Sequence, residues 1–158
     1  NKKKKFHKCI HYIKTDNNNF LKWKNKINNS KKPIIALNWQ GDKNYPFDDM
    51  RSIPLSFFKD MLKNKNFSFI SLQKDFGSEQ IKLNNFSSNL TDLSNEIDLG
   101  ENTYEDTISI LKNIDLLIAP DSSITALAGT LNIKTYLMLA HNPDWRWYIE
   151  LNKKHMID

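Results

Sequence analysis

The sequence predicts an α/β domain in which helices cover both faces of a Rossmann-like parallel sheet of about five or more strands, a three-layer arrangement. Short runs of consecutive apolar residues alternate with amphipathic runs, which is typical of a parallel sheet buried on both faces. The length of 158 residues suits one domain with a substantial core. Hydrophobic residues make up 39% of the chain and aromatic residues 11%, as expected for a folded protein.

The first expected elements follow from the spacing of apolar residues. A strand is predicted at residues 34–39, with Pro33 tolerated at its start, and a second strand at residues 67–72. Between them a helix is predicted at about residues 55–63, with Pro54 in its first turn. The inner stripe of that helix is expected to consist of Phe57, Phe58, Met61 and Leu62.

The pattern of apolar residues is less regular in residues 78–99 than in the segments before and after them. Residues 78–95 allow a short helix and a loop, and residues 97–99 are expected to form a short third strand. Thr103 and Asp106 have the spacing of a capping box, which predicts a helix start. The last two strands are predicted at residues 116–119 and 135–139, and the helix between them is expected to bury Ile124, Leu127, Ala128 and Leu131.

The positive charge of the chain is concentrated near its beginning. Residues 1–32 contain eleven lysines and one aspartate, whereas residues 33–158 have a net charge of −5, so the overall +5 comes from the first segment. We interpret residues 1–32 as a basic leader with a linker helix, and residues 33–158 as the ligand-binding domain. The acidic remainder argues against nucleic-acid binding; salt-dependent binding through the leader is the alternative.

Cellular location and metal content are also constrained by the sequence. No apolar run approaches the roughly 20 residues that a membrane-spanning helix needs, and no signal peptide precedes the first strand. The single cysteine, Cys9, cannot form an internal disulfide, so a cytoplasmic location is expected. The four histidines lack metal-ligand spacing and there is no DxD motif, so neither a cofactor nor a metal is expected.

The turn after the strand at residues 116–119 is a candidate phosphate site. Asp121 is expected to cap the following helix, and Ser122, Ser123 and Thr125 place hydroxyl groups in its first turn. Unpaired N–H groups and the helix dipole at such a start favour a diphosphate. The alternative is a capped helix with nothing bound.

Two cations follow the first predicted strand. Lys43 and Arg51 are candidate catalytic residues, because cations there would stabilise the charge on a departing nucleoside diphosphate. The alternative is that Asp48 and Asp49 merely neutralise them. Gln40 and Gly41, in the same loop, are candidates for binding the molecule that carries this nucleoside diphosphate, the donor.

The loop after the second predicted strand contains three further candidates. Gln73, Gly77 and Glu79 lie where a ligand would bind, and the carboxylate of Glu79 could accept both ribose hydroxyls. Glu79 is alternatively an acid favoured by the N-terminus of a helix, and the glycine could serve only to turn the chain. Gly129 is instead expected to make a close helix–sheet contact.

A fourth group of candidates follows the last predicted strand. Trp145 and Trp147 flank Arg146, one of two arginines in the chain. The rings could stack on a base or sugar, and Arg146 could pair with phosphate or with Asp144. The alternative for the tryptophans is burial in the core.

The motifs together resemble a known family. The stretches IIALNWQGDKNY, RSIPL, FISLQKDFGSEQ, IDLG, DLLIAPDSSITALAGTLNIKTYLML and PDWRW run in one order from about residue 34 to residue 147. This set is similar to the C-terminal region of bacterial tetratricopeptide-repeat glycosyltransferases, which are related to the lipopolysaccharide heptosyltransferases of glycosyltransferase family 9. Even the leader resembles the segment that joins the two halves of such enzymes.

The resemblance implies a GT-B architecture, in which two Rossmann-like domains face a cleft and the C-terminal one holds the nucleotide sugar. Lys43 matches a lysine that contacts phosphate or sugar, and Glu79 matches a ribose-binding carboxylate. The general base is expected in the N-terminal domain, outside this chain, and transfer is expected without a metal. Ala126 stands where similar sequences have a histidine that helps to bind the donor phosphates. The diphosphate loop matches Asp121, Ser122 and Ser123.

The sequence thus leads to two hypotheses about function. The first is a glycosyltransferase that moves a sugar from a nucleoside-diphosphate donor to an acceptor, of which this chain alone would bind donor weakly and turn over nothing. The second is a non-catalytic nucleotide-sugar-binding or interaction module, which Ala126 favours.

Overall fold

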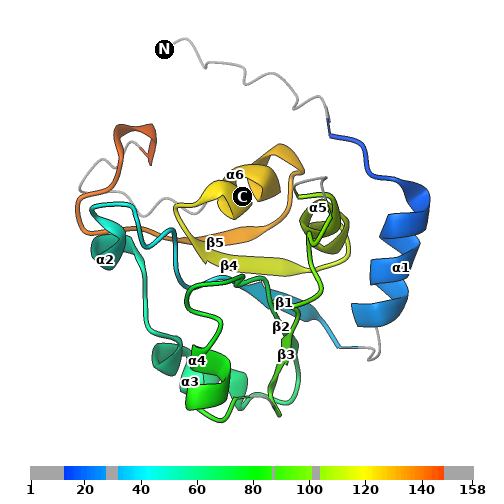
Figure 1. Ribbon diagram of the computed structural model, residues 1–158, viewed down its shortest axis with the longest axis horizontal. Coiled ribbons are helices and arrows are strands. Elements are labelled where there is room, and N and C mark those ends of the chain that lie inside the picture. Colours follow the sequence, from blue (N-terminus) through cyan, green and yellow to red (C-terminus); the bar gives the residue numbers. More distant parts are fainter. Residues whose placement is uncertain (1–12, 28–31, 87, 101–103, 148–158) are drawn as a thin grey trace, which may run out of the picture.

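The computed structural model describes residues 13–27, 32–86, 88–100 and 104–147. At its centre is a five-stranded sheet with the order β3-β2-β1-β4-β5, in which every neighbouring pair is parallel (Figure 1). The predicted Rossmann-like α/β arrangement is therefore confirmed. The strands are β1 (Ile34–Leu37), β2 (Ser68–Ser71), β3 (Leu90–Asp92), β4 (Leu116–Pro120) and β5 (Thr135–Met138).

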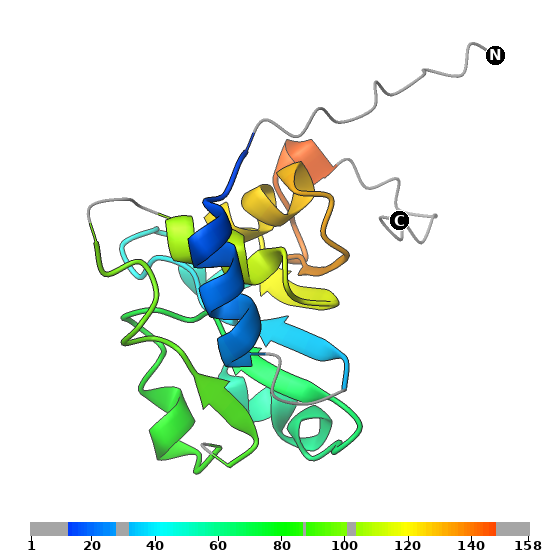
Figure 2. The same cartoon turned by 90° about the vertical axis from the view of Figure 1, so that its right-hand side faces the viewer.

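Helices cover both faces of the sheet (Figures 1 and 2). One face is covered by α1 (Asn17–Ile27), α5 (Glu105–Leu111) and α6 (Ser123–Thr130). The other face is covered by η1 (Leu55–Phe58), α3 (Lys59–Leu62) and α4 (Gln80–Leu83). Two short helices lie on the side away from α1 in Figure 1, namely α2 (Asp48–Arg51) and η2 (Trp145–Trp147).

The central strand β1 shows why the apolar runs are continuous. Ile34 and Ala36 belong to the core under α1, α5 and α6, whereas Ile35 and Leu37 belong to the core on the opposite face. Successive side chains of a strand point to opposite faces, so a strand buried on both faces needs an apolar residue at every position.

The predicted third strand at residues 97–99 is wrong. The third strand is β3, which pairs with β2. Ile97 is buried in the core, but its N–H donates to the carbonyl of Leu93 in a turn, and Asp98 has a φ of +49°. Ile97 is apolar because it is buried in a turn, not because it belongs to an extended strand.

The predicted helix at residues 55–63 forms as η1 followed by α3, and its inner face differs from the prediction. Leu55 and Leu62 are buried, but Phe57 is 78% exposed, so its predicted place in the core is wrong. The first turn is a 3₁₀ helix with three residues per turn, so the α-helical spacing misplaces residues near its start.

Part of the basic leader is packed into the domain. Helix α1 begins after Asp16, whose carboxylate accepts a hydrogen bond from the N–H of Asn19 at 3.1 Å, as an N-cap does. Trp23 and Ile27 are buried in the same core cluster as β1, and α1 lies along α5 (Figure 2). Residues 17–27 therefore share the hydrophobic core of the domain.

The start of α5 is capped by Asp98, which lies seven residues before Glu105, the first residue of the helix. Thr103, the predicted capping residue, lies outside the described residues. The carboxylate of Asp98 accepts hydrogen bonds from the N–H groups of Asp106 and Thr107, and the N–H of Asp98 donates to Asp106 Oδ2 at 2.9 Å. The carboxylate of Asp98 thus accepts from two N–H groups in the first turn of α5 that have no partner within the helix.

Trp23→Phe is expected to reduce the loss of stability at acid pH. Burial alone would raise the pKa of Asp106, but hydrogen bonds, first that from Trp23 Nε1 at 2.6 Å, lower it below its ordinary value of 3.8. A lowered pKa stabilises the fold above pH 4, and this contribution disappears as the pH falls through the folded-state pKa. Urea unfolding should show that the free energy of unfolding falls less between pH 6 and pH 3 in Trp23→Phe than in the wild type, by about 1 kcal/mol. An unchanged pH profile would contradict the assignment.

Two further findings complete the fold. Gly129 is exposed, and a Cβ added there would have no neighbour within 4 Å, so the predicted close helix–sheet contact is wrong. Among the helices of the described residues, none has the length and apolarity needed to cross a membrane.

Candidate functional site at the carboxyl edge of the sheet

The loops that follow β1, β2 and β4 lie next to one another. All strand pairs are parallel and β1 lies between β2 and β4, so the carboxyl ends of these strands share one edge. The chain continues from β1 to β2 and β3, and then returns to β4 on the other side of β1. In open α/β sheets, ligands bind at the carboxyl edge beside such a reversal of strand order. Most of the predicted site residues belong to these three loops.

Gln73 joins the loop after β1 to the loop after β2. Its Oε1 accepts hydrogen bonds from Asn38 Nδ2 at 2.7 Å, from the N–H of Trp39 at 3.1 Å and from the N–H of Gln40 at 3.0 Å. Its Nε2 donates to the carbonyls of Gln40 and Phe76. Gln73 is 3% exposed, and its amide is engaged on both sides within the protein. The structure therefore gives this predicted donor-binding residue a role in shaping the site.

Gly77 allows the same two loops to approach closely. Its φ is +94°, a backbone conformation that favours glycine, and a Cβ there would lie 2.6 Å from Gln40 Oε1. Trp39 Nε1 donates to the carbonyl of Gly77 at 3.2 Å, and Gln80 Nε2 donates to Gln40 Oε1 at 2.9 Å. The predicted alternative, that this glycine turns the chain, agrees with these contacts.

A cleft of about 500 Å³ opens between these loops. Two of the predicted residues, Gln40 and Lys43, line it. Lys43 is exposed, its ammonium lies 5.6 Å from the centre of the Phe76 ring, and it has no ion pair within the described residues. Lys43 is thus a cation that a ligand could use. Other lining residues, which the sequence did not single out as ligand-binding, are Tyr45, Asp48, Asp49, Ser52, Phe76 and Gln80.

Arg51, the second predicted catalytic cation, is engaged by the protein itself. Its Nε donates to Asp48 Oδ1 at 2.9 Å, and its Nη1 donates to the main-chain carbonyl of Asp121 at 2.7 Å. The guanidinium also lies 4.5 Å from the centre of the Tyr45 ring. Asp48 therefore neutralises Arg51, as the predicted alternative states, whereas Lys43 remains available to a ligand.

The turn between β4 and α6 differs from the predicted cap. Ser122, rather than Asp121, occupies the N-cap position, and no side chain caps the first turn of α6. The carboxylate of Asp121 instead accepts a hydrogen bond from Arg146 Nη2 at 3.1 Å. Ser122 Oγ is buried without a hydrogen-bond partner in the part of the chain that the structure describes, and the same is true of Asn38 Oδ1 at the end of β1. These two atoms belong to the loops on either side of the strand-order reversal.

The two remaining hydroxyls of this turn have partners in the protein. Ser123 is exposed, and its Oγ accepts a hydrogen bond from the hydroxyl of Tyr104 at 2.8 Å. Thr125 is buried, and its Oγ1 donates to the carbonyl of Pro120 at 2.7 Å. Of the three predicted hydroxyls, only that of Ser122 lacks a partner among the described residues.

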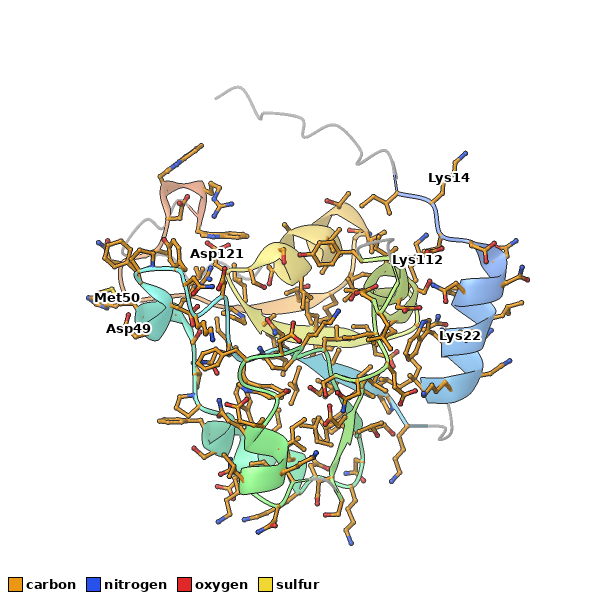
Figure 3. All side chains as sticks on the ribbon, viewed as in Figure 1. Lys14, Lys22, Asp49, Met50, Lys112 and Asp121 are labelled. Carbon is orange, nitrogen blue, oxygen red and sulfur yellow. The ribbon has the colours of Figure 1, made fainter. Side chains whose placement is uncertain are left out.

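Arg146 reaches the site from the segment after β5. Its Nε donates to Asp144 Oδ1 at 2.9 Å in addition to its contact with Asp121. The N–H and the guanidinium of Arg146 lower the pKa of Asp144, and the two carboxylates raise the pKa of Arg146. Trp145 is 84% exposed, so the predicted alternative of core burial does not hold for it. Figure 3 shows Asp121 on the side of Asp49, opposite α1.

Glu79 lies beside the cleft rather than in its lining. It is exposed, and its Oε2 accepts a hydrogen bond from the N–H of Gly77 at 2.8 Å. It immediately precedes α4, as the predicted alternative of an acid at a helix N-terminus requires. The described contacts of Glu79 are therefore local.

A second cavity, of about 550 Å³, lies between α1 and the start of α5. It is lined mainly by carboxylates and amides, among them Asp16, Asn19, Asp98 and Asp106. Asp98 and Asp106 already cap α5, so their carboxylates are engaged in the fold.

Comparisons with family models, curated proteins and solved structures found no match to this chain.

Proposed function

We propose that this chain is the nucleotide-sugar-binding domain of a GT-B glycosyltransferase, which transfers a sugar from a nucleoside-diphosphate donor to an acceptor. The observation that carries the proposal is the pair of buried, unpartnered atoms Asn38 Oδ1 and Ser122 Oγ beside the strand-order reversal. Nearly all buried polar atoms in native proteins have partners, which are water or ligand when the protein supplies none. The resemblance to family 9 supplies the class of ligand.

The start of α6 suits the diphosphate of such a donor. The helix has no acidic residue in its first turn and no side-chain cap, so its first N–H groups are open to an anion. Arg146 neutralises the nearby carboxylate of Asp121, which reduces its repulsion of a phosphate. In this proposal α6 holds the diphosphate, and Lys43 stabilises the charge on the leaving group.

The rest of the proposal follows from the resemblance. The general base that activates the acceptor belongs to an N-terminal domain outside this chain, and transfer proceeds in the cytoplasm without a metal. This chain by itself binds the donor weakly and does not turn it over.

A second candidate function is a non-catalytic module that binds a nucleotide sugar or another protein. Two observations favour it. Ala126 is exposed on α6 and has no group that could bind phosphate, and the guanidinium of Arg51 is already engaged by Asp48 and Asp121. Donor binding without transfer in the longer native protein would support the module over the enzyme.

Titration calorimetry with UDP-, GDP- and ADP-sugars is expected to show binding with a micromolar-to-millimolar Kd, roughly −8 to −4 kcal/mol. Lys43→Ala and Ser122→Ala should each weaken it about tenfold, because each removes a polar or charged contact to the diphosphate. Lys65→Ala is the matched control, since Lys65 is an exposed lysine in the turn before β2, at the opposite edge of the sheet. Unchanged affinity in both site variants would refute the site.

A further inference from the structure

The chain contains two arginines, and both contact Asp121. Arg51 binds its main-chain carbonyl, whereas Arg146 binds its carboxylate. Asp121 lies between the end of β4 and Ser122, the N-cap residue of α6. The two contacts therefore act on the residue that sets the position of the α6 start.

The contact from Arg51 belongs to a larger network, which we call the Asp48–Arg51 clasp and which consists of Gly41, Asp48, Arg51 and Ser52. Asp48 is 7% exposed; its Oδ1 accepts from Arg51 Nε at 2.9 Å and its Oδ2 accepts from Ser52 Oγ at 2.8 Å. Ser52 Oγ in turn accepts from the N–H of Gly41 at 2.9 Å. The clasp thus ties the loop after β1 to the turn after β4.

The geometry of the clasp requires a guanidinium. Arg51 donates from Nε to a carboxylate and from Nη1 to a carbonyl at the same time, because its donors are held in one rigid plane. The ammonium of a lysine is a compact point charge and cannot make this fork. Charge alone is therefore insufficient at this position.

We propose that Arg51 is a positioning residue: with Asp48 it holds the main chain of Asp121 so that the start of α6 is arranged for an anion. For the identity of the ligand, this inference rests on the proposed function. It assigns Arg51 a role different from direct contact with the leaving diphosphate. The two roles predict opposite effects of one substitution.

Asp48→Asn distinguishes the two roles by the direction in which it changes the affinity for anions. If Arg51 bound the anion directly, removal of the Asp48 charge would free the guanidinium and raise the affinity for inorganic pyrophosphate and for UDP, GDP and ADP. If the clasp positions α6, the same change lowers that affinity, by about tenfold, because the fork loses its charged partner. Asp60→Asn is the matched control: Asp60 is an exposed aspartate on α3 that does not line the cleft, so the loss of its charge should leave affinity unchanged.

Arg51→Lys supplies a second test. The positioning role predicts that Arg51→Lys lowers the affinity for these anions about tenfold, although the positive charge is retained. The double variant with Asp48→Asn should bind them no more weakly than either single variant. Nearly full affinity in Arg51→Lys, or increased affinity in Asp48→Asn, would overturn the proposal. Thermal unfolding of each variant shows whether the domain remains folded.

A ligand-free measurement separates this inference from the proposed function. In ¹⁵N NMR spectra of the chain, Arg51→Lys is expected to shift the amide signals of Ser122, Ser123 and Ile124, and Asp60→Asn is expected to leave them in place. Signals at the α6 start that do not move in Arg51→Lys would overturn the positioning role. If the wild-type chain binds none of the anions, the proposed function fails, and the NMR result still decides the role of Arg51.

Discussion

Gly41→Ala is expected to lower the free energy of unfolding by about 3 kcal/mol and to weaken pyrophosphate binding about tenfold. A Cβ at this position would overlap with Asp48 Oδ1 and with the guanidinium of Arg51. These atoms are the ends of side chains, and moving them away from the new Cβ is expected to break their mutual hydrogen bond and the contact with Asp121. Asp48 would then remain buried next to an arginine that no longer pairs with it, which is costly in a poorly solvated site.

Urea unfolding and calorimetry of the same variant test both effects. Gly129→Ala is the matched control, because Gly129 lies exposed within α6 and a Cβ there would have no neighbour within 4 Å. Alanine favours a helix over glycine by roughly 0.5–1 kcal/mol, so this control should be neutral or slightly more stable. Wild-type stability in Gly41→Ala would show that the clasp contributes little.

Gln73→Ala is expected to destabilise the fold by about 3 kcal/mol and to disorder the cleft. The substitution leaves the N–H groups of Trp39 and Gln40 and the amide of Asn38 without their acceptor. Leaving buried polar groups unpaired costs more than a typical hydrogen bond contributes. The loops after β1 and β2 would also lose the side chain that joins them, so the effect should extend to Lys43 and Phe76 across the cleft.

The midpoint of urea unfolding measures the first effect, and the NMR signals of the two loops measure the second. Asn25→Ala is a suitable control, because it also removes a side-chain amide but from an exposed position on α1. A loss below about 1 kcal/mol in Gln73→Ala, the value of one ordinary hydrogen bond, would contradict the proposed joining role.

Much of the fold could be predicted because burial on both faces leaves a local signal. The strands that became β1 and β4 were visible as consecutive apolar residues, and those that became β2 and β5 as short segments rich in apolar residues, each within one or two residues of its ends. The third strand was missed because Leu90 is the one buried residue of β3, which has the pattern of an edge strand. Ile97 was mistaken for a strand residue because burial alone does not distinguish a turn from a strand.

The candidate site was predictable only in outline. Loops after parallel strands share one edge of a sheet, so the sequence was sufficient to place Gln40, Lys43 and Ser122 near that edge. It did not reveal that Phe76 and Tyr45 line the cleft, although both are aromatic residues in loops close after a strand. An aromatic residue in a loop directly after a parallel strand was a signal that could have identified both residues.

The sequence by itself determined the fold class and the edge at which the candidate residues gather, because hydrophobic periodicity is a local property. Only the tertiary structure decided which polar groups are available to a ligand. Arg51 is bound to Asp121, 70 residues away, and Gln73 to Asn38, 35 residues away, whereas Lys43 has no ion pair within the described residues. Partners so distant in the chain are brought together by packing of the loops, and no local pattern of residues records them.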